Sequence, residues 1–221
     1  MKTIAMLGAV SVLAATSVAS AGLSYTGSFN WDDGGTVLGS YGSNVTFANV
    51  VDPFGESASD RALKISEDPL SGTPQGYLAF IDGLNDGDTI NVSMMGLGDG
   101  SLTGKIRLWA HYTTSDVTSY GGSAGGSSEY STSSTEWTML SNEWTFSGGL
   151  ASGGDHTGLV IEARLYAYSS NDDPSGWVDD INVEVFSTSS DVSISFASVP
   201  APGALALLGL AGIAGRRRGR N

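Results

Sequence analysis

The sequence predicts an all-β protein whose main domain is a β-sandwich. Apolar residues alternate with polar ones along most of the chain, as in strands that bury one face. Clusters of Gly, Asn, Asp and Ser separate these segments and mark turns. No segment outside the two ends carries a helical period. An up-and-down barrel is the second choice, whereas the lack of an internal repeat argues against a propeller or a solenoid.

We expect about nine or ten strands, because alternating segments of strand length recur between turn clusters. The first lies at 24–29 and is followed by a turn at 30–35, and a Gly- and Ser-rich loop runs from 119 to 134. The segment 191–196 is either a last edge strand or the start of a stalk. The other expected strands are 44–51, 61–65, 76–81, 88–95, 105–112, two short pieces within 136–146, 158–168 and 177–186.

Alternation also predicts which side chains share a face of a strand. In 105–112 it separates an apolar face from one that carries Lys105, Arg107, Trp109 and His111. The predicted apolar faces are Ile90, Val92 and Met94; Ile106, Leu108, Ala110 and Tyr112; and Ile181, Val183 and Val185, with Asp179 on the same side.

Residues 1–21 have the pattern of a secretory signal peptide. Lys2 is followed by an apolar segment at 4–18 and by the small residues Ala19, Ser20 and Ala21. Cleavage after Ala21 would leave residue 22 as the first of the mature chain. An uncleaved anchor is the alternative, although the apolar segment is short for a membrane span.

The other end combines a Pro pair, an apolar segment and a basic cluster. Residues 201–215 are uncharged and span 15 positions, fewer than the roughly 20 that cross a bilayer as a helix. This segment predicts a short transmembrane helix, and the arginines after it predict that its end faces the cytoplasm. A buried core helix is the alternative.

Pro200-Ala201-Pro202, the apolar segment and the cluster Arg216, Arg217 and Arg218 resemble the PEP-CTERM sorting signal of Gram-negative bacteria. In that family a Pro-Glu-Pro motif, a short helix and an Arg cluster are recognised by an exosortase, and Ala201 stands here in place of Glu. The resemblance covers 199–221. It implies export, an exosortase-type partner, transient membrane anchoring, and a place in the cell envelope or on the extracellular surface.

The segment between the two ends, 22–198, is strongly acidic and has no cysteine. It holds all 23 acidic residues and five basic ones, so its formal charge is −18. Such a domain repels nucleic acid and anionic membranes and suits divalent cations or neutral partners. An acidic surface that only maintains solubility is the alternative. Without cysteine there are no disulfides, thiol nucleophiles or thiolate metal sites.

Several segments follow one another as in galactose-binding-like jelly rolls. The closing segment 175–183 places an Asp pair before an apolar alternation. Earlier ones are Ser28-Phe29-Asn30, Ala62-Leu63-Lys64-Ile65, Gly76-Tyr77-Leu78 with the Gly87-Asp88 turn, and 137–144 before the strand 158–168. The chain from 24 to 186 thus resembles this family, whose fold many carbohydrate-binding modules share. The resemblance implies a jelly-roll sandwich for 22–198.

The same resemblance implies a structural calcium ion between the opening and the closing strand. Calcium takes about six to eight oxygen ligands. The matching donors are Asn30, where the family usually has Glu, Asp32 or Asp33, and Asp179 or Asp180. By strand alternation one residue of the last pair must point inward, where a carboxylate needs a cation or hydrogen-bond donors. A carboxylate bonded to loop amides is the alternative.

No residue of the sequence is expected to be catalytic. The sequence contains no zinc-protease helix motif and no P-loop. His111 and His156 are isolated, and we expect both at the surface or in loops. No acidic residue stands out as a glycosidase carboxylate, and Glu162 is the one that its strand would place on a concave face.

Aromatic residues are the better indication of function, because sugar rings stack on the flat faces of Trp and Tyr. Tyr77 and Trp109 lie on predicted sheet faces, and Tyr120 and Trp137 flank the glycine-rich loop. These four are the predicted ligand-binding residues. A place in the core or at a strand edge is the alternative for Trp109, as for the tryptophans at 144 and 177.

We therefore expect an exported, non-catalytic sandwich at the cell surface or in the extracellular matrix, where it binds polysaccharide. The domains expected are a signal peptide at 1–21, the sandwich at 22–198 and the sorting signal at 199–221. A secreted carbohydrate-active enzyme and a structural biofilm protein without a discrete ligand are the alternatives.

Overall fold

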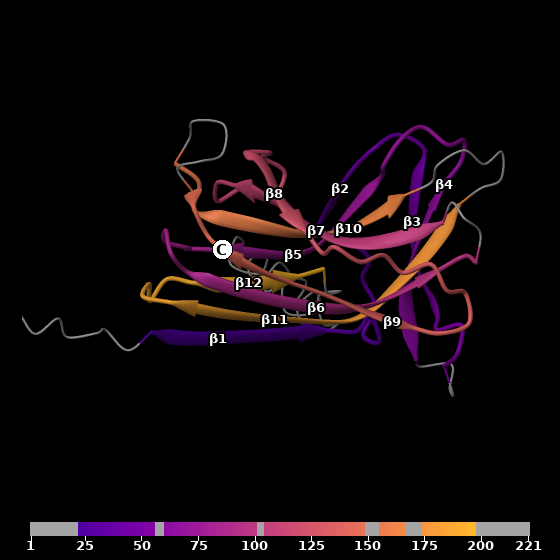
Figure 1. Ribbon diagram of the computed structural model, residues 1–221, viewed down its shortest axis with the longest axis horizontal. Coiled ribbons are helices and arrows are strands. Elements are labelled where there is room, and N and C mark those ends of the chain that lie inside the picture. The colour runs from indigo at the N-terminus through magenta and orange to yellow at the C-terminus, as the bar shows by residue number, and fades with distance from the viewer. Residues whose placement is uncertain (1–21, 56–59, 101–103, 149–154, 167–173, 198–221) are drawn as a thin grey trace, which may run out of the picture.

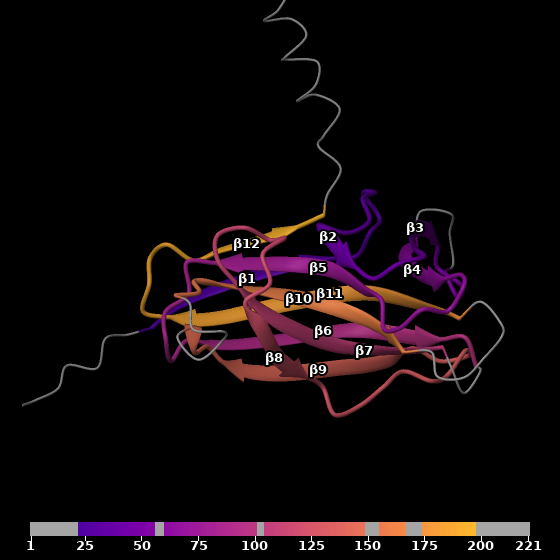
Figure 2. The same ribbon diagram turned by 90° about the horizontal axis from the view of Figure 1, so that it is seen from above.

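The computed structural model describes residues 22–55, 60–100, 104–148, 155–166 and 174–197. They form two antiparallel sheets that face each other (Figures 1 and 2). The first, called the β11 sheet, contains β1 (Leu23–Phe29), β3 (Val45–Val51), β4 (Arg61–Glu67), β6 (Thr89–Gly98), β9 (Thr138–Thr145) and β11 (Ser175–Ser187). The second, called the β10 sheet, contains β2 (Gly39–Tyr41), β5 (Gln75–Asp82), β7 (Lys105–Thr113), β8 (Gly122–Gly126), β10 (Gly158–Tyr166) and β12 (Ser193–Phe196).

The order of the central strands defines a jelly roll. Strands β4 to β11 fill two layers of four, ordered β4-β11-β6-β9 and β5-β10-β7-β8. Most consecutive strands therefore alternate between the sheets, as in the paired Greek keys of this architecture. Two separate sheets exclude the up-and-down barrel and confirm the predicted sandwich.

The four remaining strands extend the sheets where β11 and β5 change partners. β11 pairs with β4 through Ser175–Val178 and with β1 through Ile181–Ser187. β5 pairs with β2 through Gln75–Tyr77 and with β12 through Ala79–Asp82. Each change coincides with a β-bulge, directly after Asp179 in β11 and at Leu78 in β5. The bulge in β5 directs the side chain of Tyr77 to the outer face of the β10 sheet.

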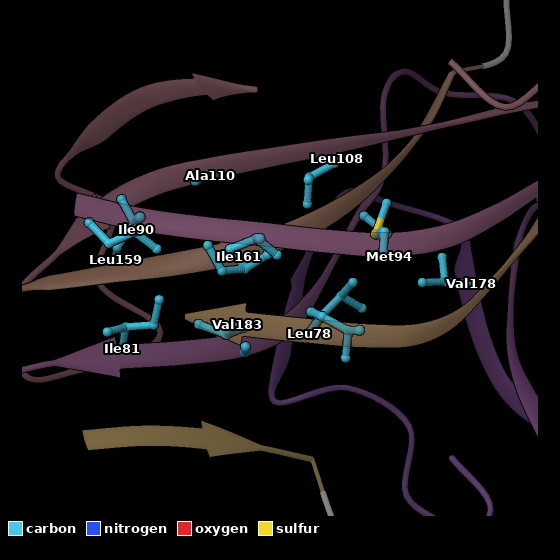
Figure 3. Close-up of a cluster of buried hydrophobic side chains, with 14 of the residues drawn as sticks. Leu78, Ile81, Ile90, Met94, Leu108, Ala110, Leu159, Ile161, Val178 and Val183 are labelled. Atoms are coloured by element: carbon cyan, nitrogen blue, oxygen red, sulfur yellow. The ribbon is translucent and has the colours of Figure 1, made fainter. Parts of the chain in front are cut away.

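One hydrophobic core fills the space between the sheets. Figure 3 shows side chains of β6 and β11, among them Ile90, Met94 and Val183, opposite Leu108 of β7 and Ile161 of β10. All five are at most 3% exposed. Burying a side chain of this size contributes about 1.5–3 kcal/mol each relative to exposure, so this layer holds the sheets together.

Most predicted strands and the turn at 30–35 are confirmed, and two local expectations are wrong. The segment 136–146 forms one strand, β9, rather than two pieces, and the Gly- and Ser-rich segment contains β8. The predicted turn at 30–35 contains Trp31, which is fully buried at a φ of 63°. Its indole Nε1 donates to the carbonyl of Thr36 over 2.8 Å, so the turn is fastened into the core. The predicted apolar face of β7 is confirmed, because its four members all contact the core.

The expectation that one Asp of the 179/180 pair points into the core is wrong. The bulge inserts an extra residue, so Val178 before it and Ile181 after it both face the core. Asp179 pairs with Met95 on the outer face, and Asp180 is exposed with a φ of 46°. The grouping of Asp179 with Ile181 on one face is wrong for the same reason.

Within the described residues, no helix is long and apolar enough to cross a membrane. The predicted signal peptide at 1–21 and the sorting signal, with Pro200, Ala201, Pro202, Arg216, Arg217 and Arg218, lie outside those residues.

Candidate functional site

The outer face of the β10 sheet carries two rows of side chains that run across its strands. In the first row, Tyr77 of β5 lies opposite Glu162 of β10, which lies opposite Trp109 of β7. The second row, two residues further along each strand, is Tyr41 of β2, Gln75 of β5, Arg164 of β10 and Arg107 of β7. Register alone therefore gathers three aromatic rings and two guanidinium groups on one surface.

Glycine closes the first row at both ends and leaves room for its rings. Gly39 of β2 is the partner of Tyr77, and a Cβ on it would lie 2.8 Å from the tyrosine Cδ2. Gly126 of β8 is the partner of Trp109, and a Cβ there would clash with the carbonyl oxygen of Leu108 and lie 2.8 Å from the indole Cε3. Real Cβ atoms do not approach so closely, so the Tyr77 ring requires glycine at 39, and the β7 backbone together with the Trp109 ring requires it at 126.

A buried group of charged residues lies between these rings. The carboxylate of Glu162 has no exposed surface, and Arg164 Nε donates to its Oε2 over 2.7 Å. His111 Nδ1 donates to Oε1, an assignment that follows from the acceptor-only chemistry of an ionised carboxylate. Both oxygens of Glu162 are thus engaged, which offsets the cost of burying its charge.

Two tyrosines cover this buried group. The ring of His111, 1% exposed, lies 5.0 Å from the Tyr77 ring in an edge-to-face arrangement and 5.4 Å from the Tyr120 ring. Burial, and then the charge of Glu162, raises the pKa of Tyr77, so its hydroxyl stays protonated. His111 Nε2 is buried without a hydrogen-bond partner among the described residues. Tyr120 lies above it and is 62% exposed.

Trp109 supports the two guanidinium groups. The central carbons of Arg164 and Arg107 lie 4.4 and 4.5 Å from the centre of its ring, within cation–π range. The indole Nε1 donates to Ser123 Oγ over 2.9 Å, which fixes the ring plane. Arg107 is further held by the carbonyl of Ser127 and by Tyr130. Trp109 therefore positions the arginines rather than presenting a free ring face.

Above these residues the surface forms a cleft of about 400 Å³. Arg164 is the only charged residue that lines it, and no Asp or Glu is among its described lining residues, which are Tyr41, Gln75, Tyr77, Tyr120, Ser123 and Arg164. Tyr41 and Tyr120 are 65% and 62% exposed, so their rings are open to a ligand. The cleft offers aromatic surface and hydrogen-bond donors from hydroxyl, amide and guanidinium groups.

Three of the four predicted ligand-binding residues lie on this face. Tyr77 and Tyr120 line the cleft, and Trp109 lies beneath its arginine. Trp137 directly precedes β9, a strand of the other sheet, and is not among the described residues that line the cleft. The expectation that His111 is a surface or loop residue is wrong, because its side chain is buried against Glu162.

Sequence reasoning missed Tyr41, Gln75 and Arg164. Tyr41 lies on a strand of three residues that carries no alternation. The pairing of Arg164 with Gln75 joins residues far apart in the chain and depends on the register around the bulge in β5. One signal was available, since alternation already placed Arg107, Trp109 and His111 on the same side of β7.

The predicted metal ligands lie near one another at the end of the β11 sheet. Phe29 of β1 pairs with Ile181 of β11, and the following residues Asn30 and Asp33 line a hollow of about 270 Å³ with Asp180. Asp32 accepts hydrogen bonds from Asn30 Nδ2 at 2.7 Å and from the backbone N–H of Arg61 at 2.9 Å. Both oxygens of Asp32 thus accept hydrogen bonds from amide groups.

Asp179 is the perturbed group of this region. Burial raises its pKa to about 7, and the nearby charges of Asp180, Asp52 and Asp32 act in the same direction, against a hydrogen bond from the Asp180 N–H. A carboxylate with three acidic neighbours is one that a cation would stabilise. No group of three or more His, Asp or Glu side chains in the described part of the chain has the geometry to hold a metal ion. Calcium binding therefore stays a prediction.

A second hollow lies on the outer face of the β11 sheet and has a different chemistry. It measures about 880 Å³, and its lining includes Asn91 of β6, Glu143 of β9 and Glu184 of β11. Its described lining residues include no aromatic ring and no cation. The cleft on the β10 sheet is therefore the better candidate for a stacked ligand.

No protein-family model and no curated protein matches the chain. Among solved structures, it is similar to the xylan-binding domain CBM22-1 of Paenibacillus barcinonensis Xyn10C, with 13% identity over 78% of this chain and 100% of that one, at a TM-score of 0.45. It is similar to the CBM22-1 and GH10 modules of Clostridium thermocellum xylanase 10B, with 12% identity over 70% of this chain, at a TM-score of 0.44, and spans 26% of that chain. A third is the family 11 carbohydrate-binding module of Clostridium thermocellum, with 16% identity over 76% of this chain and 89% of that one, at a TM-score of 0.37. The fold assignment rests on the strand order given above.

Proposed function

We propose that this protein is a non-catalytic, glycan-binding β-sandwich that is exported to the cell surface or the extracellular matrix. The observation that carries the proposal is the cleft on the β10 sheet, where the exposed rings of Tyr41 and Tyr120 flank Arg164. Sugars combine apolar C–H faces with hydroxyl rims, and tyrosines beside fixed polar groups match both parts.

The cleft is pre-formed, which favours binding. Arg164 is held by Glu162 and by the Trp109 ring, and Trp109 is held by Ser123. Residues that are already ordered lose little conformational entropy when a ligand arrives. The buried ionic group thus acts as a rigid support for the surface that touches the ligand.

The chemistry of the cleft supports binding rather than glycoside hydrolysis. Most glycosidases place two accessible carboxylates on either side of the scissile bond. Here the described lining residues contain none, and Glu162 beneath them is fully buried with both oxygens engaged. A secreted carbohydrate-active enzyme remains the rival, and sugar release from any polysaccharide, abolished by one Glu or Asp substitution, would support that rival.

Export and anchoring complete the proposal. The signal-peptide pattern of 1–21 and the Pro-Ala-Pro, apolar and Arg-cluster pattern of 199–221 support processing at both ends, the second by an exosortase-type enzyme. Mass spectrometry of the protein from its native cells tests both steps. We expect cleavage after Ala21 and loss of the tail near Pro200. A protein that keeps residues 1–21 or the tail would contradict the corresponding step.

A glycan array with the full chain tests the binding function. Tyr41→Ala and Tyr120→Ala should each reduce the signal about tenfold, since an exposed stacking ring contributes on the order of 1–2 kcal/mol. Met139→Ala is the matched control, because Met139 is 65% exposed on the other sheet. An array without signal for wild type, or equal losses in all three variants, would contradict the proposal and favour a structural protein without a ligand.

A further inference from the structure

The positive charge of this acidic protein is concentrated on the face that holds the cleft. Residues 22–198 contain 23 acidic and five basic side chains. Three of the five, Lys105, Arg107 and Arg164, lie on β7 and β10 of the β10 sheet and point away from the core. The other two lie on β4 of the β11 sheet, where Arg61 bonds Asn49 and Lys64 lies over the Trp177 ring.

The described lining of the cleft also carries positive rather than negative charge. Its described residues include one cation and no carboxylate, although acidic residues outnumber basic ones more than twofold in the chain. Every polar side chain that lines the cleft can donate a hydrogen bond, and the guanidinium of Arg164 can only donate; the others are the amide of Gln75 and the hydroxyls of Tyr41, Tyr77, Tyr120 and Ser123. Such a set fits a ligand rich in acceptors and negative charge.

Arg164 is held in place by two described residues and has N–H donors that bind no described residue. Its Nε donates to Glu162, and its guanidinium carbon lies 4.4 Å from the centre of the Trp109 ring. Neither Nη1 nor Nη2 makes a hydrogen bond with a described residue. The side chain is 14% exposed at the cleft. A guanidinium held on one edge presents the remaining N–H groups as a fork whose geometry matches a carboxylate.

From these observations we infer that the cleft selects glycans that carry carboxylate groups, and that Arg164 binds the carboxylate. The inference rests on the proposed glycan-binding function and adds its substrate class, a hexuronate-containing polysaccharide. Tyr41 and Tyr120 contact the sugar faces, and Arg164 binds the carboxylate between them. The acidic surface elsewhere does not prevent this, because at physiological ionic strength its repulsion is screened beyond about 8 Å.

The test compares ligands that differ only in the carboxylate. Oligomannuronate and oligogalacturonate are titrated into the full chain by calorimetry, each beside its carboxyl-reduced, neutral form of equal length. Charge-assisted hydrogen bonds predict that at least one acidic form binds about tenfold or more tightly than its neutral form. In Arg164→Gln the acidic and neutral forms should bind equally, whereas Tyr120→Ala should weaken both.

Arg164→Gln removes one hydrogen-bond partner of Glu162 and therefore lowers the stability of the fold. The double variant Glu162→Gln/Arg164→Gln removes both charges together and leaves no buried carboxylate without a partner, and melting curves report whether each variant is folded. Equal binding of the acidic and neutral forms to wild type, or an acid preference that survives in the double variant, would overturn the inference and leave the glycan-binding function standing. Absence of binding to every neutral and acidic glycan would overturn both.

Discussion

Arg164 donates a hydrogen bond to the buried carboxylate of Glu162 over 2.7 Å and also lies at the floor of an open cleft. One residue therefore stabilises the sheet and lines the cleft. Removing it should be costly, because a buried charge that loses a partner typically costs about 3 kcal/mol or more.

We predict that Arg164→Gln lowers the free energy of unfolding by about 3 kcal/mol, and that Glu162→Gln/Arg164→Gln lowers it by less. Urea denaturation measures both values. Lys64→Gln is the control, since its contact with Trp177 at 5.5 Å is worth less than about 1 kcal/mol. A double variant less stable than Arg164→Gln would show that the ionic group is not what stabilises this region.

Gly39→Ala should damage the cleft without touching the ligand. The new Cβ would lie 2.8 Å from the Tyr77 ring, and such overpacking costs about 1–3 kcal/mol and displaces the ring. Glycan binding should weaken together with stability. Gly22→Ala is the matched control, since its Cβ meets nothing closer than 3.7 Å. Unchanged stability and binding in Gly39→Ala would contradict the packing described for Tyr77.

Asp179 should make the protein less stable as the pH rises. Its folded pKa of about 7 exceeds the ordinary value of 3.8, so the folded state holds the proton more tightly than the unfolded chain. The contribution is full below about pH 4 and is lost as the pH rises through about 7. Asp179→Asn should therefore be more stable than wild type at pH 8, and the difference should shrink towards pH 4.

Asp116 provides the opposite case for the same titration. Hydrogen bonds from the N–H and then from the hydroxyl of Thr118 lower its pKa, so its stabilisation is present above its ordinary pKa and is lost as the pH falls. Asp116→Asn should be less stable than wild type at neutral pH and equal to it in acid. With rising pH, the stability relative to wild type should thus increase for Asp179→Asn and decrease for Asp116→Asn. A change in the same direction for both variants would contradict the raised pKa of Asp179.

Calcium, if it binds at Asn30, Asp32, Asp179 and Asp180, should compete with the proton on Asp179. The increase in melting temperature on adding calcium should then be larger at pH 8 than at pH 6, and a chelator should reverse it. Asp179→Asn should reduce the increase. A melting temperature that calcium and chelator leave unchanged at both pH values would rule the prediction out.

The strands could be predicted because burial imposes alternation, and the pairings could not. Ile90, Val92 and Met94 mark β6 by their spacing, whereas β8, Gly122–Gly126, has no apolar alternation and is a strand only because β7 lies beside it. His111 was correctly placed away from the core. Its burial comes from Tyr77 and Tyr120, and its bond to Glu162, 51 residues away, depends on sheet register. Alternation along one strand contains no information about which side chains cover a residue or about the sheet register.

A crystal structure of the protein with an oligosaccharide selected from the array tests the central claim most directly. We predict the ligand in the cleft of the β10 sheet, with a sugar ring against Tyr41 or Tyr120 and a polar group within hydrogen-bond distance of Arg164. A ligand bound instead on the outer face of the β11 sheet, beside Asn91 and Glu184, would contradict it.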